Sequence, residues 1–242
     1  MSYYGPDPMS PEQRPSGWKA IVRVIYEPTA MFQEFNGRVP IFPGYFAQML
    51  LGLISFIMLV PMTLRVLEQT MLSNPMYTPE LAAISKWSGL VGGGFAILVT
   101  PWLAGLLTAL IAMFFGQFQE ERVGFTSYLG MLGYARMPLI ISSLLGAALT
   151  LAMGDTATQF NLSLAALAPQ GAPAMVTALL GTLNPFTAWY YFVLATGFGA
   201  LHRGKAAKGV ALVVTLYALN LLFSLAGAAI GGSFLSQMPG QM

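Results

Sequence analysis

The sequence has no cysteine and only one histidine, His202, in 242 residues. Without cysteine, the chain has no disulfide bond, thiolate nucleophile, iron–sulfur cluster or cysteine-based zinc site. One histidine cannot form a multi-histidine metal cage or a His–Cys catalytic pair within one copy. A lone imidazole could ligate a haem or a chlorophyll-type pigment, but a histidine at a helix end among basic neighbours is more typical of a surface. We therefore expect no cofactor, no metal and no enzymatic activity.

Charge is equally scarce. Lysine, arginine, aspartate and glutamate make up 8% of the chain, whereas 56% is hydrophobic and the mean hydropathy is +0.66. A soluble domain carries about 25% charged residues, so this composition predicts an integral membrane protein. The net charge of +2 is too small to indicate nucleic-acid binding.

In place of charged residues, the sequence contains long apolar runs. About 20 apolar residues cross the hydrocarbon core, and five runs approach or exceed that length. Apart from Gln48, Arg136 and Asn220, only Gly, Pro, Ser and Thr interrupt them, and their lack of strict alternation favours helices over a barrel. We predict an all-α, polytopic helical bundle with five transmembrane helices, at approximately residues 41–64, 87–115, 128–153, 185–201 and 209–230.

The segments outside these runs are shorter and more polar. Residues 1–17 are rich in proline and predict a disordered tail, and residues 231–242 form a second tail. Residues 18–40 predict a cytoplasmic amphipathic segment, in which an interfacial helix presents an apolar stripe. Within residues 160–183 two apolar stretches are each too short to cross, so we predict interfacial or re-entrant helices; a sixth, broken span is the alternative. The stripe of the interfacial helix is formed by Trp18, Ile21, Val22 and Ile25, and its polar side by Lys19, Arg23 and Glu27.

The basic residues predict the orientation. Eight of the eleven fall on the side of the N-terminus, two on the opposite side, and Arg136 lies within the third run. Lysine and arginine favour the cytoplasmic side, so the N-terminus is predicted to be cytoplasmic and the C-terminus outside. A sixth span would place the basic residues between the last two runs on the outer side.

An ionisable residue inside a span is costly, which makes Arg136 the first candidate for a polar site. A lipid headgroup, an anionic substrate or a partner carboxylate could bind there. Alternatively, Arg136 extends its side chain from the helix end to the lipid phosphates. The candidate polar site consists of Arg136, Glu120, Glu121, Tyr134 and Asn184.

Small residues four positions apart indicate close helix packing, either within the bundle or between copies. Such pairs include Gly89 with Gly93, Ala195 with Gly199, and Gly227 with Gly231.

Three stretches resemble the Yip (Ypt/Rab-interacting protein) family of membrane proteins. Residues 128–141 are similar to the family's aromatic-then-proline entry into its third span. Residues 183–198 resemble its Phe-x-x-Trp opening of the fourth span, here Phe186 and Trp189, and residues 25–32 resemble the amphipathic lead-in of bacterial members. The resemblance implies five spans, a cytoplasmic N-terminus and an outer C-terminus. The Asp-Leu-x-Gly-Pro element of eukaryotic members is absent, so small-GTPase binding is not carried over.

These observations favour a non-enzymatic protein of a bacterial inner membrane. We expect it to act as a scaffold, a membrane-organising factor or an accessory subunit, in contact with the lipid bilayer and with other membrane proteins or further copies of itself. A small lipid or ion transporter or channel is the first alternative, and an accessory subunit of a larger redox or pigment complex is the second.

Overall fold

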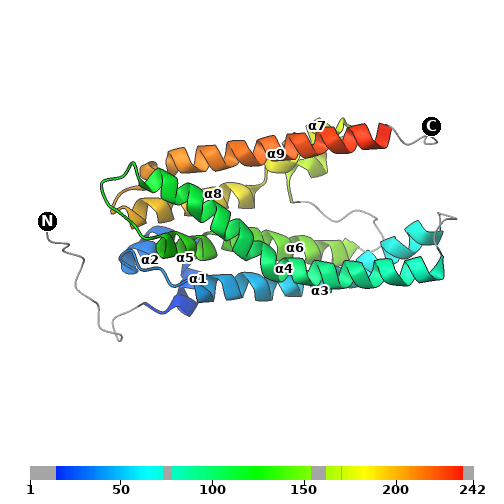
Figure 1. Ribbon diagram of the computed structural model, residues 1–242, viewed down its shortest axis with the longest axis horizontal. Helices are drawn as coiled ribbons and strands as arrows, with labels where there is room; N and C mark the ends of the chain where they lie inside the picture. The colour runs from blue at the N-terminus through cyan, green and yellow to red at the C-terminus, as the bar shows by residue number, and fades with distance from the viewer. Residues whose placement is uncertain (1–14, 73–77, 154–161, 170, 237–242) are drawn as a thin grey trace. The chain divides into compact units, whose positions relative to one another are not determined.

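The computed structural model describes residues 15–72, 78–153, 162–169 and 171–236, which fold into helices joined by short connections (Figure 1). Within these ranges there is no strand, so the predicted all-α class is confirmed. Most of the two predicted tails and residues 154–161 of the predicted re-entrant region lie outside the described residues.

Four helical stretches among the described residues are long and apolar enough to cross a membrane. They belong to α3 (Phe42–Leu72), α4 (Pro79–Gly116), the pair α5 (Phe125–Ala135) and α6 (Met137–Met153), and α9 (Val210–Ser236) with the preceding η3 (Ala206–Gly209). The remaining predicted span coincides with α8 (Pro185–Leu201). With 17 residues, α8 is shorter than the roughly 20 residues that cross a bilayer without local thinning.

The observed helices differ from the predicted spans where local chemistry outweighs hydropathy. α4 begins eight residues before the predicted span because Thr78 caps it: its Oγ1 accepts a hydrogen bond from Leu81 N (3.3 Å), and Pro79 opens the first turn. The third predicted span is two helices that break at Arg136. Pro138 explains the break, because it has no N–H and its ring crowds the carbonyl four residues earlier.

The N-terminal segment contains α1 (Gly17–Tyr26) and α2 (Pro28–Glu34). α1 contacts both α2 and α5, and its buried residues are Ala20 and Val24 rather than those of the apolar stripe expected from the sequence. Trp18 and Val22 are 51% and 59% exposed. The helix thus has two apolar faces, one of which is fully buried while the other is only partly covered.

By their internal contacts the residues divide into two compact units. Of the described residues, unit 1 comprises 15–48, 101–138 and 189–214, and unit 2 comprises those within 49–100, within 139–188 and from 215 to 236. In unit 1, every residue of α5 from Ser127 to Ala135 is buried, as expected for a helix that is apolar on all sides and surrounded by others. α3 and α5 touch backbone to backbone, because a Cβ added to Gly44 would lie 2.6 Å from the carbonyl carbon of Gly133.

Unit 2 contains most of α3 and α4, together with α6, η2 (Leu164–Leu167), α7 (Ala174–Thr182) and most of α9. α3 and α4 pack through glycines, since Gly93 faces the Phe56 ring and Gly52 faces Ile97. α7 packs on η2, and Leu164 N donates a hydrogen bond to Leu183 O (2.9 Å). At 1.5 Å per residue the nine residues of α7 extend about 14 Å, too little to cross a bilayer.

Candidate functional site

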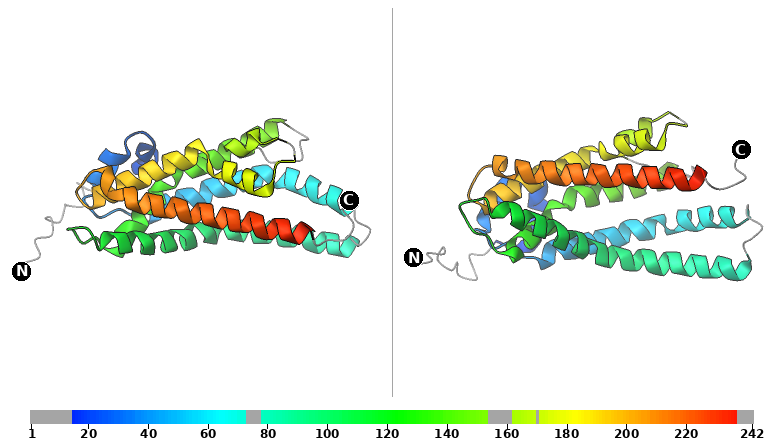
Figure 2. Two further views of the ribbon diagram at one scale, coloured as in Figure 1. Left: turned by 90° about the horizontal axis from the view of Figure 1, so that it is seen from above. Right: turned by 45° about the horizontal axis from the view of Figure 1, so that its top comes forward.

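Three connections of unit 1 meet at one end of its helices. They are the turn after α2, the α4–α5 loop and the turn that follows α8, and the last two lie at the same end in both views of Figure 2. Ser127 Oγ donates a hydrogen bond to Gly37 O, which joins α5 to the first turn. His202 Nδ1 lies 3.0 Å from Glu121 O, and this contact joins the α4–α5 loop to the turn after α8.

A cavity of about 610 Å³ lies among these connections. Most of its lining is polar or charged, and it contains no aromatic side chain. The lining residues are Gln33, Asn36, Gly37, Arg38, Glu121, Arg122, Val123, Gly124, Ala200, Leu201, Arg203, Gly204 and Lys205.

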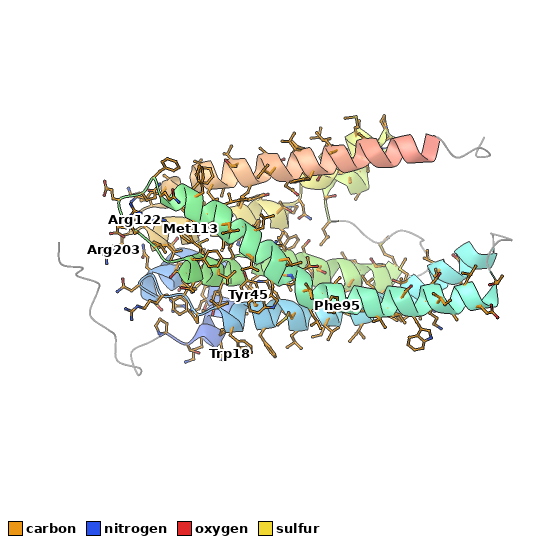
Figure 3. All side chains as sticks on the ribbon, in the orientation of Figure 1. Trp18, Tyr45, Phe95, Met113, Arg122 and Arg203 are labelled. Carbon is orange, nitrogen blue, oxygen red and sulfur yellow. The ribbon has the colours of Figure 1, made fainter. Side chains whose placement is uncertain are left out.

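The lining carries four cationic side chains and one carboxylate. Arg203 Nε lies 3.4 Å from Glu121 Oε1, and both side chains are partly exposed. Among the described residues, no ion pair forms with the other three cations, Arg38, Arg122 and Lys205. Figure 3 shows the labelled Arg122 and Arg203 close to one another at this end. The cavity therefore has an excess of positive charge.

The turn after α8 places Arg203 where glycine is usual. Gly204 N donates to Gly199 O (2.8 Å) and Arg203 N donates to Ala200 O (3.1 Å), a pattern that closes a helix through a left-handed residue. That residue is Arg203, with a φ of 47°. A side chain other than glycine costs free energy in this conformation, so the arginine is held at the cavity against a local backbone preference.

His202 lies directly beneath this turn and is fully buried. Tyr128 Oη lies 2.9 Å from its Nε2, and the Phe198 ring packs against the imidazole. Because Nδ1 faces a carbonyl oxygen, it carries the proton, and Tyr128 donates to Nε2. Burial lowers the pKa of His202 below its ordinary value. The interpretation of His202 as a surface residue was wrong, since the sequence does not reveal that α5 supplies a hydroxyl to it.

The residues of the predicted polar site are not gathered at the cavity. Only Glu121 lines it, while Glu120 is exposed next to it. Asn184 caps α8, where its Oδ1 accepts from Phe186 N (2.8 Å). Tyr134 is buried in unit 1, and its Oη has no hydrogen-bond partner among the described residues.

Arg136 lies at the α5–α6 break, among aromatic residues. Its guanidinium lies near the hydroxyl groups of Tyr190 and Tyr45, and the Tyr45 ring stacks on Trp102 with 4.3 Å between the ring centroids. Arg136 Nε and Tyr45 Oη have no hydrogen-bond partner in the described part of the chain. A role for Arg136 as a site remains a prediction, and its surroundings here are tyrosines rather than carboxylates.

The predicted packing glycines have different surroundings. An added Cβ on Gly199 would lie 2.3 Å from Lys205 O, and Gly209 would meet the backbone of Ala195, so this pair is used within unit 1. A Cβ on Gly89 or Gly227 would meet no atom within 4 Å. Gly231 lies in a part of α9 whose side chains are outside the described residues.

On α1, the polar residues form a local ion-pair network. Arg23 pairs with Glu27 at 3.3 Å and with Glu34 of α2 at 2.6 Å, which joins the two helices. The hydrogen bonds from Arg23 lower the pKa of Glu34. Trp18 contacts Phe42 and Phe46 edge to face, and Lys19 is exposed.

Comparison with known proteins identifies the family. The Yip1 domain matches residues 22–228, from α1 into the last part of α9. The chain belongs to the Yip1 domain family. No curated protein and no solved structure matches it.

The Yip1 domain covers the whole cavity, the His202 contacts and the four apolar helical stretches apart from the last residue of the fourth. Membership confirms the resemblance to the Yip family, and together with these helices it makes the chain an integral membrane protein. The cavity residues Arg38, Arg203 and Lys205 entered the sequence interpretation only as orientation signals. Their position next to apolar runs on one predicted side was the available clue, but only the fold shows that the three connections meet.

Proposed function

We propose that this Yip1 domain protein is a non-enzymatic scaffold, membrane-organising factor or accessory subunit that associates with other membrane proteins or with further copies of itself. It crosses a bacterial inner membrane five times, through α3, α4, the α5–α6 pair, α8 and α9, with a cytoplasmic N-terminus and an outer C-terminus. The cavity of unit 1 then faces the cytoplasm.

The observation that carries the proposal is the uncovered apolar surface of unit 2. Nearly all its large apolar side chains are at least partly exposed, and the Gly89 and Gly227 positions are open. Lipid tails can cover leucine and phenylalanine, but small residues favour the close approach of another helix. Uncovered glycines on apolar helices therefore support contact with a partner helix.

The orientation can be tested directly because the natural chain contains no cysteine. Single cysteines would be introduced by Glu80→Cys, Gln117→Cys, Ala174→Cys and Ala207→Cys, and intact cells would be treated with a membrane-impermeant maleimide. We expect labelling at positions 80 and 174, and labelling at 117 and 207 only after permeabilisation. The same accessibility at 174 and 207 would contradict a span formed by α8.

The association can be tested in the same background by oxidative cross-linking in native membranes. We expect Gly89→Cys to give a homodimer or an adduct with a second protein. Val91→Cys is the matched control, because its side chain is highly exposed on a different side of α4. Equal cross-linking at the two positions would contradict a specific contact, and solute movement by the purified, reconstituted protein would favour the transporter alternative.

A further inference from the structure

We propose that the unit 1 cavity is a binding site for a phosphate group, carried by an anionic lipid headgroup or by a small free phosphate compound. No residue of this site except Glu121 belongs to the polar site predicted from the sequence, and phosphate binding does not depend on the scaffold role. Only the lipid source rests on the proposed membrane orientation.

The charge of the lining determines the sign of the ligand. Four cations face one carboxylate, Glu121, and that carboxylate is already paired with Arg203. The three cations without an ion pair among the described residues, Arg38, Arg122 and Lys205, come from three different connections. Cations from separate elements repel one another and gain most from an anion with several acceptor oxygens between them, such as a phosphate.

The size and polarity of the cavity restrict the rest of the ligand. About 610 Å³ accommodates a phosphate with a small polar group attached. The lining has no aromatic side chain on which a nucleotide base could stack, and its only side chains from the larger apolar residues are those of Val123 and Leu201. The amides of Gln33 and Asn36 can hydrogen-bond hydroxyl groups. A glycerol-like or sugar-like headgroup therefore fits better than a nucleotide or an apolar ligand.

The position of the cavity favours a lipid as the source. The lining residues lie a few positions from the start of α3 at Phe42, the start of α5 at Phe125 and the end of α8 at Leu201. Exposed apolar side chains of Phe42, Phe118 and Val210 flank the same connections. The cavity thus lies where apolar helices begin and end, which is the depth of lipid phosphates in a bilayer.

The backbone supports a site in which Arg203 is selected for its side chain. Glycine would suit the left-handed conformation of residue 203 better than arginine does. Beneath it, the contact of His202 with Glu121 O fixes the loop that carries Arg122. Arg122 and Arg203 are therefore held on two connections that are tied together, so the arrangement needs little reordering when an anion binds.

The test measures binding to the purified full-length chain in mild detergent by native mass spectrometry. The probes are dioctanoyl phosphatidic acid, dioctanoyl phosphatidylcholine and inorganic phosphate. We expect phosphatidic acid to bind in preference to phosphatidylcholine, with an affinity reduced about tenfold by Arg122→Gln and by Arg203→Gly. Lys86→Gln is the control, since it removes one exposed cation from α4 outside the cavity.

Competition by inorganic phosphate separates the two sources. If inorganic phosphate displaces phosphatidic acid from the natural chain but not from Arg122→Gln, a free phosphate compound is sufficient for binding. If inorganic phosphate does not displace phosphatidic acid from the natural chain, binding requires the lipid headgroup. Should either arginine variant melt at a clearly lower temperature than the natural chain, Lys205→Gln at an exposed position replaces it. Equal binding by Arg122→Gln and Lys86→Gln would overturn the proposal, as would binding of a hexaglutamate peptide in place of phosphatidic acid.

Discussion

Unit 1 and unit 2 differ in where their apolar side chains lie. Among the described residues, every buried apolar side chain belongs to unit 1 except that of Ala147. In water such an asymmetry would leave half of the chain without a core. In a bilayer, lipid tails are as apolar as leucine, so helices of unit 2 need no core of their own. Unit 1 therefore contains nearly all the buried apolar packing, whereas unit 2 presents apolar surfaces that lipid tails can cover.

Replacing glycine by alanine should give the largest difference in stability between a variant in unit 1 and a variant in unit 2. Gly44→Ala places a methyl group 2.6 Å from the Gly133 backbone, which cannot move aside as a side chain can. We expect it to destabilise the folded protein by about 3 kcal/mol. Gly89→Ala meets no atom within 4 Å and should stabilise its helix by about 0.5–1 kcal/mol.

The melting temperatures of both variants in the same detergent would check this contrast. A similar loss of stability for the two would mean that unit 2 packs as tightly around its glycines as unit 1 does.

A variant of the buried Tyr128–His202 pair would measure how much the stability of unit 1 depends on polar contacts. Tyr128→Phe leaves His202 Nε2 buried without its donor, and we expect a loss of about 1–3 kcal/mol. Denaturant or thermal unfolding in detergent would measure it. Thr63→Ser, which keeps an exposed hydroxyl on α3 in unit 2, should change stability little. An unchanged Tyr128→Phe protein would show that His202 finds another donor.

The same histidine predicts a pH dependence. Burial lowers its pKa in the folded state below the ordinary 6.5, so the unfolded chain binds more protons between the lowered value and 6.5. Stability should therefore fall as the pH decreases below about 6.5, by at most about 1.4 kcal/mol per pH unit for one proton. Arg23 lowers the pKa of the Glu34 carboxyl below its ordinary value of 4.5. This carboxyl therefore loses its stabilising charge only at a pH below that value.

Unfolding midpoints at pH 7.5, 6.5 and 5.5 would follow this trend. His202→Gln should be less stable at pH 7.5 and should have a flatter pH profile, and an unchanged slope in that variant would assign the effect to another group.

The sequence predicts helices from hydropathy but not where they end. α3 continues past the predicted residue 64 through Arg65 and Glu68 because these residues favour helices although they are charged. Similarly, a cap at Thr78 and a proline at 138 moved one boundary and divided another span. The periodicity of α1 predicted one apolar stripe, but the buried residues of this helix, Ala20 and Val24, lie on its opposite face.

The candidate site could be predicted from the sequence even less well. Glu121 and Arg122 are neighbours in the chain, but Arg38 and Arg203 are far from both, and only tertiary folding brings them to one cavity. The sequence predicted a site at Arg136 because this residue is a charge inside an apolar run. The charges that line the cavity are unremarkable in the sequence, because each lies in an ordinary polar connection.

Arg203→Gly should have the smallest effect on stability. Whether it raises or lowers the stability shows whether the arginine has a structural role. Glycine relieves the left-handed conformation, which costs an arginine about 1–2 kcal/mol, while the partly exposed pair with Glu121 contributes about 0–1 kcal/mol. We therefore expect the variant to be more stable by about 1 kcal/mol in detergent without added phosphate, with Arg203→Ala as the control that removes the pair but keeps the strain. A less stable glycine variant would mean that the ion pair outweighs the strain and that the arginine has a structural role. A more stable one would mean that unit 1 loses stability by keeping a cation at this turn, as expected if the cation serves a ligand.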